Sequence, residues 1–311
     1  MSRILEDAPS QNDAHKVEVL ANALKREATR LLAQKLDPGL YVVATPIGNL
    51  GDVTVRALST LALADIVYCE DTRHSARLLQ HYGLRPVTRP LHDHNEEAEI
   101  KRVIQELGRA KSIALISDAG TPLVSDPGFK LVRACVEAGH AVIALPGPSA
   151  VMGALSVSGL PTDAFFFAGF LAPRQAARRA RLAELKTIPA TLIFFEAPQR
   201  VAETLADLAD VLGDRPAVMA RELTKMHEEL ARGSLKTLSV QIADRDMKGE
   251  IVLVVAPPGE RMVDDEEIVT RLEVALASMR MKDAASAVAD ALGVSKSRVY
   301  DLGLKLKGKA E

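Results

Sequence analysis

Residues 113–128 read IALISDAGTPLVSDPG, and this stretch decides the fold. Its first four residues are apolar and predict a buried strand, and the glycines and prolines after them predict a tight loop at the strand's end. Small residues let a ligand approach the backbone, and the carboxylates of Asp118 and Asp126 can accept hydrogen bonds from it. Ligands of α/β proteins bind at the carboxyl ends of strands, so this loop is a candidate binding site. An ordinary strand-to-helix turn, with Asp126 as a helix cap, fits the same residues.

Three further segments repeat this pattern of an apolar run that ends in turn residues. They are residues 40–52, 142–150 and 191–200. Several such loops at one sheet edge would form a cleft, which favours a small-molecule site over unrelated turns.

Strand and helix signals alternate between residues 38 and 158. Strands are predicted at 40–43, 66–69, 113–116 and 141–145, and helices at 53–64, 96–109 and 129–138. This alternation predicts an α/β domain at 38–158 with a mostly parallel sheet and helices on both faces. A second α/β domain is predicted at 159–258, with strands at 164–169, 191–195, 217–220 and 251–255 and a helix at 200–212.

The two ends of the chain differ from this α/β body. Residues 1–37 form an N-terminal extension whose apolar residues recur at helical spacing. Residues 262–311 contain a helix, a glycine turn and a second helix capped by Ser295, which is a helix-turn-helix signature. Lys296 and Arg298 begin the second helix and are candidate nucleic-acid contacts. The alternative is a helical hairpin used for dimer packing.

Composition limits the classes of function. The chain has 311 residues, a formal net charge of −2, 4% aromatic residues and no tryptophan, which argues against a uniformly basic or aromatic-rich nucleic-acid binder. Its two cysteines, Cys69 and Cys135, lie in apolar surroundings and predict reduced core residues, and no metal-ligand pattern occurs. No segment reads as a signal peptide or a membrane span, so we expect a soluble, cytoplasmic protein.

Basic residues cluster locally in an alanine-rich stretch that includes Arg174 and Arg178. A solvated helix face explains such a cluster, and contact with RNA phosphates is the functional alternative.

Five short motifs are specific in combination. They are TPIGN at 45–49, EDTR at 70–73, SDAGTP at 117–122, FEAPQR at 195–200 and RELTK at 221–225, the last followed by His227, Glu228 and Glu229. In order and spacing they resemble the ribosomal RNA small subunit methyltransferase I family of the tetrapyrrole methylase superfamily. The resemblance covers residues 38–258 and extends to the C-terminus.

The resemblance implies two tetrapyrrole-methylase-type α/β domains, a C-terminal helix-turn-helix appendage and a homodimer. It implies an S-adenosylmethionine-dependent enzyme that methylates the ribose 2′-hydroxyl of a cytidine in the decoding region of 16S rRNA, within the small ribosomal subunit. The donor contacts that it implies are Pro46, Ile47, Asp118, Ala119, Thr121, Ser149, Ala150, Phe195 and Ala220, and it places the neighbourhood of Glu250 beside them.

Candidate catalytic residues follow two of the predicted strands. Asp71 is a candidate acceptor of the hydroxyl proton, and Arg73 can hold a phosphate; an Asp–Arg pair or a helix cap explains the same residues. Glu196 and Arg200 form a second pair at helical spacing, in which Glu196 is a candidate for binding the donor or orienting the acceptor and Arg200 a candidate RNA contact. Several histidines are weaker candidate bases.

Two other functions compete with this hypothesis. A tetrapyrrole methylase would need a large apolar cleft and gains nothing from the C-terminal helices. A helix-turn-helix regulator whose α/β body senses a ligand would not need the charged residues of 70–73 and 195–200.

Overall fold

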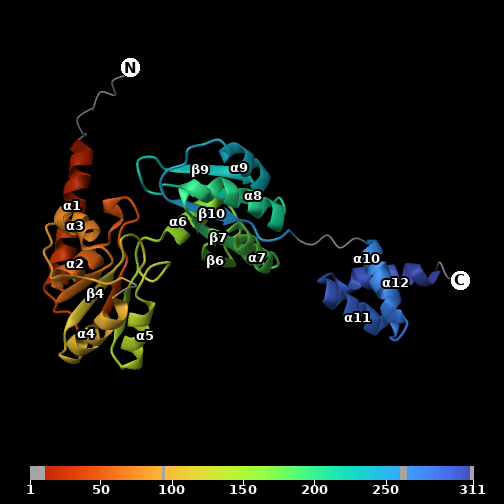
Figure 1. The fold of residues 1–311 in the computed structure, drawn as a ribbon, viewed down its shortest axis with the longest axis horizontal. Helices are drawn as coiled ribbons and strands as arrows, with labels where there is room; N and C mark the ends of the chain where they lie inside the picture. The colour runs from red at the N-terminus through yellow and green to blue at the C-terminus, as the bar shows by residue number, and fades with distance from the viewer. Residues whose placement is uncertain (1–10, 93–94, 260–264, 309–311) are drawn as a thin grey trace, which may run out of the picture. The chain divides into compact units, whose positions relative to one another are not determined.

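The computed structural model describes residues 11–92, 95–259 and 265–308. The chain divides into two compact units, with the division between Pro257 and Pro258 (Figure 1). The first unit holds two β-sheets with their helices, and the second holds helices.

The first sheet is parallel throughout. Its strands, in the order β3-β2-β4-β1-β5, are β1 (Gly39–Val43), β2 (Ile66–Cys69), β3 (Thr88–Pro90), β4 (Ser112–Ile116) and β5 (Val142–Leu145). Its helices are α2 (Val55–Leu63), α3 (Thr72–His81), α4 (Glu96–Gly108) and α5 (Phe129–Glu137). The predicted parallel sheet is confirmed.

Strand residues of this sheet alternate between two apolar cores. Ile113 and Leu115 of β4 pack with α4 and α5, whereas Ala114 and Ile116 pack with α2 and α3. Both faces are therefore covered by helices, which explains why β4 is buried throughout and apolar from Ile113 to Ile116 instead of alternating with polar residues.

The second sheet is mixed. Its strands, in the order β6-β7-β10-β8-β9, are β6 (Phe165–Phe170), β7 (Thr191–Glu196), β8 (Pro216–Arg221), β9 (Glu229–Ser234) and β10 (Ile251–Val255). Only β6 and β7 are parallel, and β10 lies antiparallel between β7 and β8. This order carries the segment before β10 to the end of the sheet where β7 finishes, because Ile251 pairs with Glu196.

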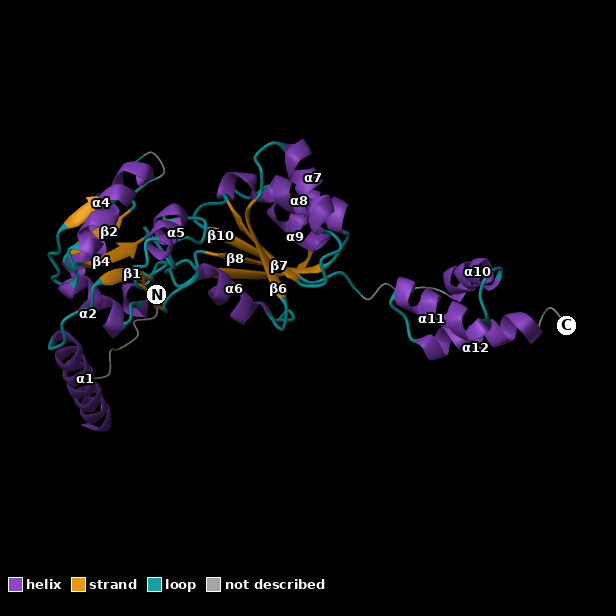
Figure 2. Ribbon diagram, turned by 90° about the horizontal axis from the view of Figure 1, so that it is seen from below, coloured by secondary structure: helices purple, strands orange, loops and turns teal. Residues whose placement is uncertain are grey.

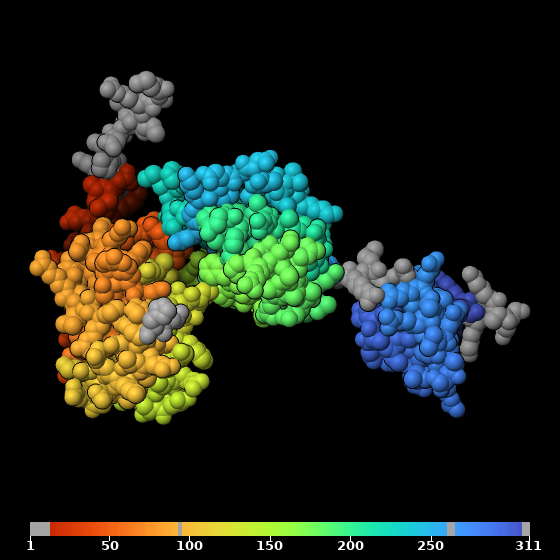
Figure 3. All heavy atoms as spheres, viewed as in Figure 1, coloured from red at the N-terminus to blue at the C-terminus, as the bar shows by residue number. Residues whose placement is uncertain are grey.

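Helices cover both faces of the second sheet as well (Figure 2). They are α6 (Ala150–Ser158) on one face and α7 (Gln175–Leu185), α8 (Val201–Leu212) and α9 (Leu235–Ile242) on the other. The space-filling view shows the two halves of this unit, each built on one sheet, side by side (Figure 3).

An additional helix, α1 (Gln11–Leu32), precedes the first sheet and contacts α2. Most of its described side chains are exposed, Leu20 and Leu24 among them. The helix agrees with the periodicity predicted for the N-terminal extension, of which residues 1–10 lie outside the described part.

The second unit is helical. It consists of α10 (Asp265–Leu276), α11 (Met281–Leu292) and α12 (Lys296–Gly308) around a small apolar core. Gly293 ends α11 in the left-handed region at φ +66°, and the Ser295 hydroxyl accepts a hydrogen bond from the backbone N–H of Arg298 at 3.3 Å. The predicted helix, glycine turn and serine-capped helix are confirmed for the described residues; 262–264 and 309–311 of the predicted domain lie outside them.

Candidate functional site

Three loops meet at the carboxyl edge of the first sheet. They follow β1, β4 and β5, which are neighbours in the sheet order. Thr45 and Gly120 exchange backbone hydrogen bonds of 2.8 and 3.0 Å, and the Thr121 hydroxyl donates to the carbonyl oxygen of Pro148 at 3.1 Å. Direct bonds therefore fasten the β4 loop to both of its neighbours.

Gly120 shows why the β4 loop needs a glycine. Its φ of +77° lies in the left-handed region, and a Cβ there would lie 3.3 Å from the Ile47 side chain. The bare backbone lets the loops after β1 and β4 lie against each other.

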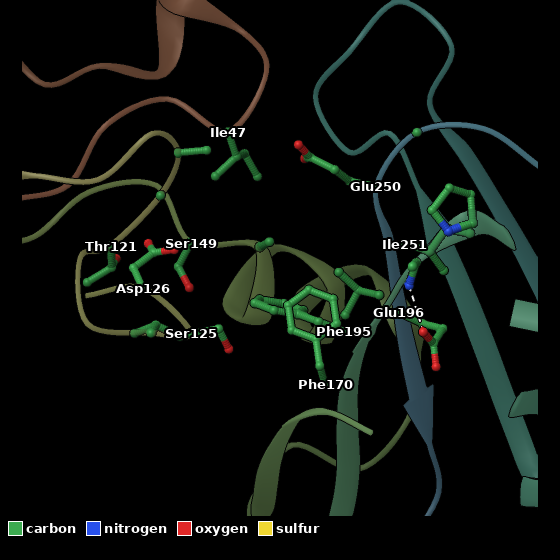
Figure 4. Close-up of a pocket in the computed structure, with 18 residues that line it drawn as sticks. Ile47, Thr121, Ser125, Asp126, Ser149, Phe170, Phe195, Glu196, Glu250 and Ile251 are labelled. Carbon is green, nitrogen blue, oxygen red and sulfur yellow. Dashed lines mark hydrogen bonds between the residues drawn. The ribbon is translucent and has the colours of Figure 1, made fainter. Parts of the chain in front are cut away.

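A cavity of about 360 Å³ opens between these loops and the second sheet (Figure 4). Six of the predicted donor contacts line it, namely Ile47, Ala119, Thr121, Ser149, Ala150 and Phe195. The second sheet contributes the end of β7 and the segment that begins β10, including Glu196 and Glu250. The structure thus brings together residues as far apart in the sequence as Ile47 and Glu250.

Aromatic rings form one wall of this first cavity. Phe195 contacts Phe167 and Phe170 edge to face, at ring-centroid distances of 4.8 and 5.6 Å, and Phe195 and Phe170 both line the space. Such a wall can pack against a flat heterocycle. Phe170 is a lining residue that the sequence did not single out, because its place depends on β6 pairing with β7.

Asp126 lies in the same cavity and does not cap the following helix, since the residue before α5 is Gly128. Burial raises the pKa of Asp126; a hydrogen bond from Ser117 lowers it, and the nearby Asp118 carboxylate raises it. A half-buried carboxyl group among apolar residues is well placed to bind a hydroxyl or amino group of a ligand.

A second cavity, of about 470 Å³, adjoins the first. The two share Ile47, Ala119 and Glu250. Two more of the predicted donor contacts, Pro46 and Asp118, line this second cavity only. Its wall also carries His74, Arg77 and Lys225.

Asp71 and Arg73 are not among the residues that line either cavity. Asp71 caps α3, where its carboxylate accepts bonds from the backbone N–H of Arg73 at 2.8 Å and from the guanidinium at 2.9 Å. These bonds to Arg73 lower the pKa of Asp71 to about 2. A carboxylate with so low a pKa is a weak base, so Asp71 is poorly suited to take a proton. The structure forms the Asp–Arg pair and the helix cap that the sequence analysis gave as the alternative.

Glu196 lies in the wall of the first cavity but is fully engaged. Its carboxylate accepts bonds from the Thr204 hydroxyl at 2.7 Å and the Ala197 backbone at 2.7 Å, and it pairs with Arg200 at 2.6 Å. The expected i,i+4 pair therefore forms, and it connects the end of β7 to the start of α8.

Ala220 lies behind the site. It is 1% exposed, belongs to the apolar core between α6 and the second sheet, and pairs with Val252, which lines the first cavity.

Comparison with known proteins decides the family. The model for tetrapyrrole (corrin/porphyrin) methylases matches residues 39–239, and that for the RsmI C-terminal HTH domain matches residues 263–307. The relative named ribosomal RNA small subunit methyltransferase I in Mesorhizobium japonicum is 50% identical over 282 residues, covering 90% of this chain and 96% of its own. The chain belongs to this family.

Other comparisons agree with the assignment. The ribosomal RNA small subunit methyltransferase I of Vibrio cholerae is 46% identical over 278 residues, covering 88% of this chain and 96% of its own. A solved uroporphyrin-III C-methyl transferase from Thermus thermophilus, complexed with S-adenyl homocysteine, has a TM-score of 0.51 at 17% identity and covers 70% of this chain and 97% of its own. The latter likeness shows the fold. The predicted family and fold are confirmed, and the chain is a methyltransferase.

The first cavity fits the donor of this methyltransferase family, S-adenosylmethionine. The aromatic wall of Phe170 and Phe195 suits the adenine ring, and Asp126 can accept hydrogen bonds from hydroxyl or amino groups. Ser149 keeps its hydroxyl proton for a ligand, because as the cap of α6 its oxygen accepts from the Met152 backbone at 3.5 Å.

The basic residues predicted to contact RNA differ from one another in how far they are exposed. The structure corrects the prediction that Arg178 contacts RNA. Its side chain is 1% exposed and its guanidinium bonds to the Asp207 carboxylate at 2.7 Å, so it cannot reach an RNA phosphate. Arg174 is exposed just before α7, and Arg200 is partly buried against Glu196.

Lys296 and Arg298 lie in the first turn of α12 and are exposed. Arg298 pairs with Asp265 of α10 at 2.7 Å. The pair shows that this arginine also fastens two helices of the second unit to each other.

Among the described residues, no helix is both long and apolar enough to span a bilayer.

Proposed function

We propose that this protein methylates the ribose 2′-hydroxyl of a cytidine in the decoding region of 16S rRNA, with S-adenosylmethionine as the methyl donor. The observation that carries the proposal is the pair of adjoining cavities in a chain of this methyltransferase family. The first cavity has an aromatic wall, and the second carries the cationic side chains of Arg77 and Lys225. The donor supplies a methyl group on a positively charged sulfur, and it occupies the first cavity.

The second cavity receives the acceptor nucleotide. Arg77 and Lys225 offer cations for its phosphate or ribose oxygens, and Asp118 offers an acceptor for hydroxyl or amino protons. The comparisons disfavour the alternative substrate, a tetrapyrrole. The likeness to tetrapyrrole methyltransferases is one of fold, at 17% identity, whereas relatives at 46% and 50% identity carry the ribosomal RNA name.

Contacts with the rest of the RNA are assigned to exposed basic residues. We assign phosphate contacts to Arg174 beside the second sheet and to Lys296 and Arg298 at the start of α12, where a helix-turn-helix motif presents its second helix. Arg200 is proposed to orient the Glu196 carboxylate, with which it pairs. Asp71 and Arg73 are kept as RNA contacts outside both cavities, where the Arg73 side chain is 90% exposed and can approach a phosphate while it pairs with Asp71.

Two further parts of the proposal concern the working form of the protein. We propose that it acts as a homodimer, which the family resemblance supports and which light scattering after size-exclusion chromatography tests. We place it in the cytoplasm, because that is where small ribosomal subunits are.

The test is a transfer assay. Purified protein is incubated with S-adenosylmethionine labelled in the methyl group and with small subunits from cells that lack this protein, and large subunits and transfer RNA serve as controls. Label in 16S rRNA alone supports the proposal. No transfer to the small subunit, with donor binding intact by calorimetry, contradicts the proposed substrate.

A further inference from the structure

Glu250 occupies a special place in the site. Three residues line both cavities, and of these Ile47 and Ala119 are apolar, so Glu250 is the titratable member of the shared lining. Its side chain is 71% exposed and extends from the segment before β10 toward Ile47 of the β1 loop (Figure 4). The two cavities meet at this shared lining.

The backbone around Glu250 is fixed by Glu222. The Glu222 carboxylate accepts a bond from the Glu250 backbone N–H at 2.9 Å, and the Glu222 N–H donates to the Glu250 carbonyl at 2.9 Å. Gly249 has a φ of +88°, and a Cβ there would collide with the Glu222 side chain. The glycine before Glu250 is therefore needed for this local geometry.

Lys225 holds the Glu250 side chain. Its ammonium lies 3.2 Å from the Glu250 carboxylate and 2.8 Å from that of Glu222. Although burial lowers the pKa of Lys225, the bonds to these two carboxylates raise it overall, so the ammonium stays charged. The aliphatic part of Lys225 covers Gly48 of the β1 loop, where a Cβ would collide with it.

We propose that Glu250 is the group that takes the proton of the acceptor hydroxyl, and that Lys225 is its positioning residue. The inference rests on the proposed function and names a catalytic residue for it. As the hydroxyl oxygen forms its bond to the methyl carbon, the carbon–sulfur bond breaks with its electron pair left on sulfur, and the O–H proton passes to the Glu250 carboxylate. The positive charge of the sulfur and the negative charge of the carboxylate disappear together, so charge balances.

Other acid–base groups of the site are less well placed. Asp126 lines only the first cavity, and His74 and Asp118 line only the second. The Asp118 carboxylate also accepts a bond from the Asp71 backbone at 3.2 Å. Glu250 therefore combines access to both cavities with a carboxylate able to receive a proton.

The test is Glu250→Gln, which keeps the shape of the side chain and removes its basicity. In single-turnover transfer to small subunits, the rate is expected to fall about 100- to 10,000-fold, the usual contribution of a positioned general base. Donor affinity by calorimetry and subunit affinity by filter binding should change less than about threefold. The matched control is Glu137→Gln on α5, which is also exposed (65%) and also ion-paired, and it should leave the rate unchanged.

A second variant tests the positioning role. Lys225→Met should lower the rate by less than Glu250→Gln, and Lys225→Arg should restore most of it, because an arginine can still pair with the carboxylate. A merely structural role of Lys225 would show as a lower melting temperature without this rescue.

The pH dependence of the transfer rate provides a second readout, which does not depend on how far Glu250→Gln lowers the rate. The wild-type rate should decline in acid, because a protonated carboxyl group cannot accept the hydroxyl proton, and the Glu250→Gln rate should lack that decline. The charged and titratable groups around Glu250, which are the same in both proteins, are Glu222 and Lys225 from the β8–β9 loop, His74 and Arg77 from α3, and Asp118 and Asp126 from the β4 loop.

The outcomes separate the two proposals. An unchanged rate for Glu250→Gln, or a loss confined to donor affinity, overturns the assignment of Glu250 while leaving the function in place. A wild-type protein that binds the donor but methylates no small subunit overturns the proposed function instead.

Discussion

Replacing Asp207 by alanine should destabilise the first unit strongly, since the change leaves a buried arginine without its main partner. Arg178 is 1% exposed and Asp207 is 2% exposed, and their side chains bond at 2.7 Å. Arg179 and Gln175 donate further bonds to the same carboxylate, at 2.8 and 3.1 Å. Asp207 is thus the centre of a network that joins α7 to α8.

The size of the effect follows from the burial. Breaking a buried ion pair by removing one partner costs about 3–5 kcal/mol, because the remaining charge is neither solvated nor paired. Glu203 lies 3.5 Å from the Arg178 guanidinium and is 71% exposed, and the Pro173 carbonyl accepts a bond from Arg178 at 3.2 Å. These partial replacements place the expected loss near 3 kcal/mol, or a fall in Tm of roughly 6–12 °C for a unit of this size.

Thermal unfolding followed by circular dichroism measures the loss, and two variants serve as controls. Arg181→Ala removes an exposed pair with Glu184, in which the arginine side chain is 47% exposed, and should cost no more than about 0.5 kcal/mol. The double variant Arg178→Met with Asp207→Leu should recover most of the stability, because it removes both charges together. A loss for Asp207→Ala as small as that for Arg181→Ala would refute the buried-pair interpretation.

Three other predictions concern the site, the second unit and pH. Asp126→Ala should weaken S-adenosylmethionine binding about tenfold or more in calorimetry while the melting temperature stays near that of the wild type, and an unchanged affinity would contradict the proposed donor contact. Deleting residues 258–311, which form a separate compact unit, should weaken RNA binding in filter assays more than donor binding; equal loss of both would indicate a structural role for those helices. Burial opposes ionisation of Asp207, but the bonds from Arg179, Arg178 and Gln175 lower its pKa overall. Its contribution to stability is therefore complete above the unfolded-state pKa and is lost as the pH falls below about 4, so urea midpoints should drop with acid more steeply for the wild type than for Asp207→Ala.

The first sheet follows from the sequence with little ambiguity. Its central strands are continuous apolar runs such as 113–116, they alternate with amphipathic segments, and each ends in glycine and proline. Strands β3 and β9 were not predicted, because both are sheet-edge strands with little apolar pattern: β3 contains Pro90, and β9 reads ELARGS.

The burial of Arg178 could not be predicted from its own segment. A basic residue in an alanine-rich helix resembles a solvated one, and its partner Asp207 lies 29 positions away on another helix. Only the packing of α7 on α8 brings the two charges together.

Only part of the site could be predicted from the residues, because the rest depends on contacts between distant segments. Residues in the loops after β1, β4 and β5 belong to one parallel sheet, so a common edge could be inferred for Ile47, Thr121 and Ser149. The family resemblance places the neighbourhood of Glu250 near the donor, but the residues alone do not, because β10 runs antiparallel between β7 and β8, an order that no local pattern reveals. The available signal was Gly249 directly before the polar residue that opens a fully apolar strand.

The central claim, methyl transfer to a ribose oxygen of 16S rRNA, is tested most directly by identifying the product. Small subunits methylated by the purified protein are digested to nucleosides, and the methylated nucleoside is separated by liquid chromatography and fragmented in a mass spectrometer. We predict a cytidine whose extra methyl group stays with the ribose fragment. A methyl group on the cytosine base, or on a different nucleoside, would contradict the account.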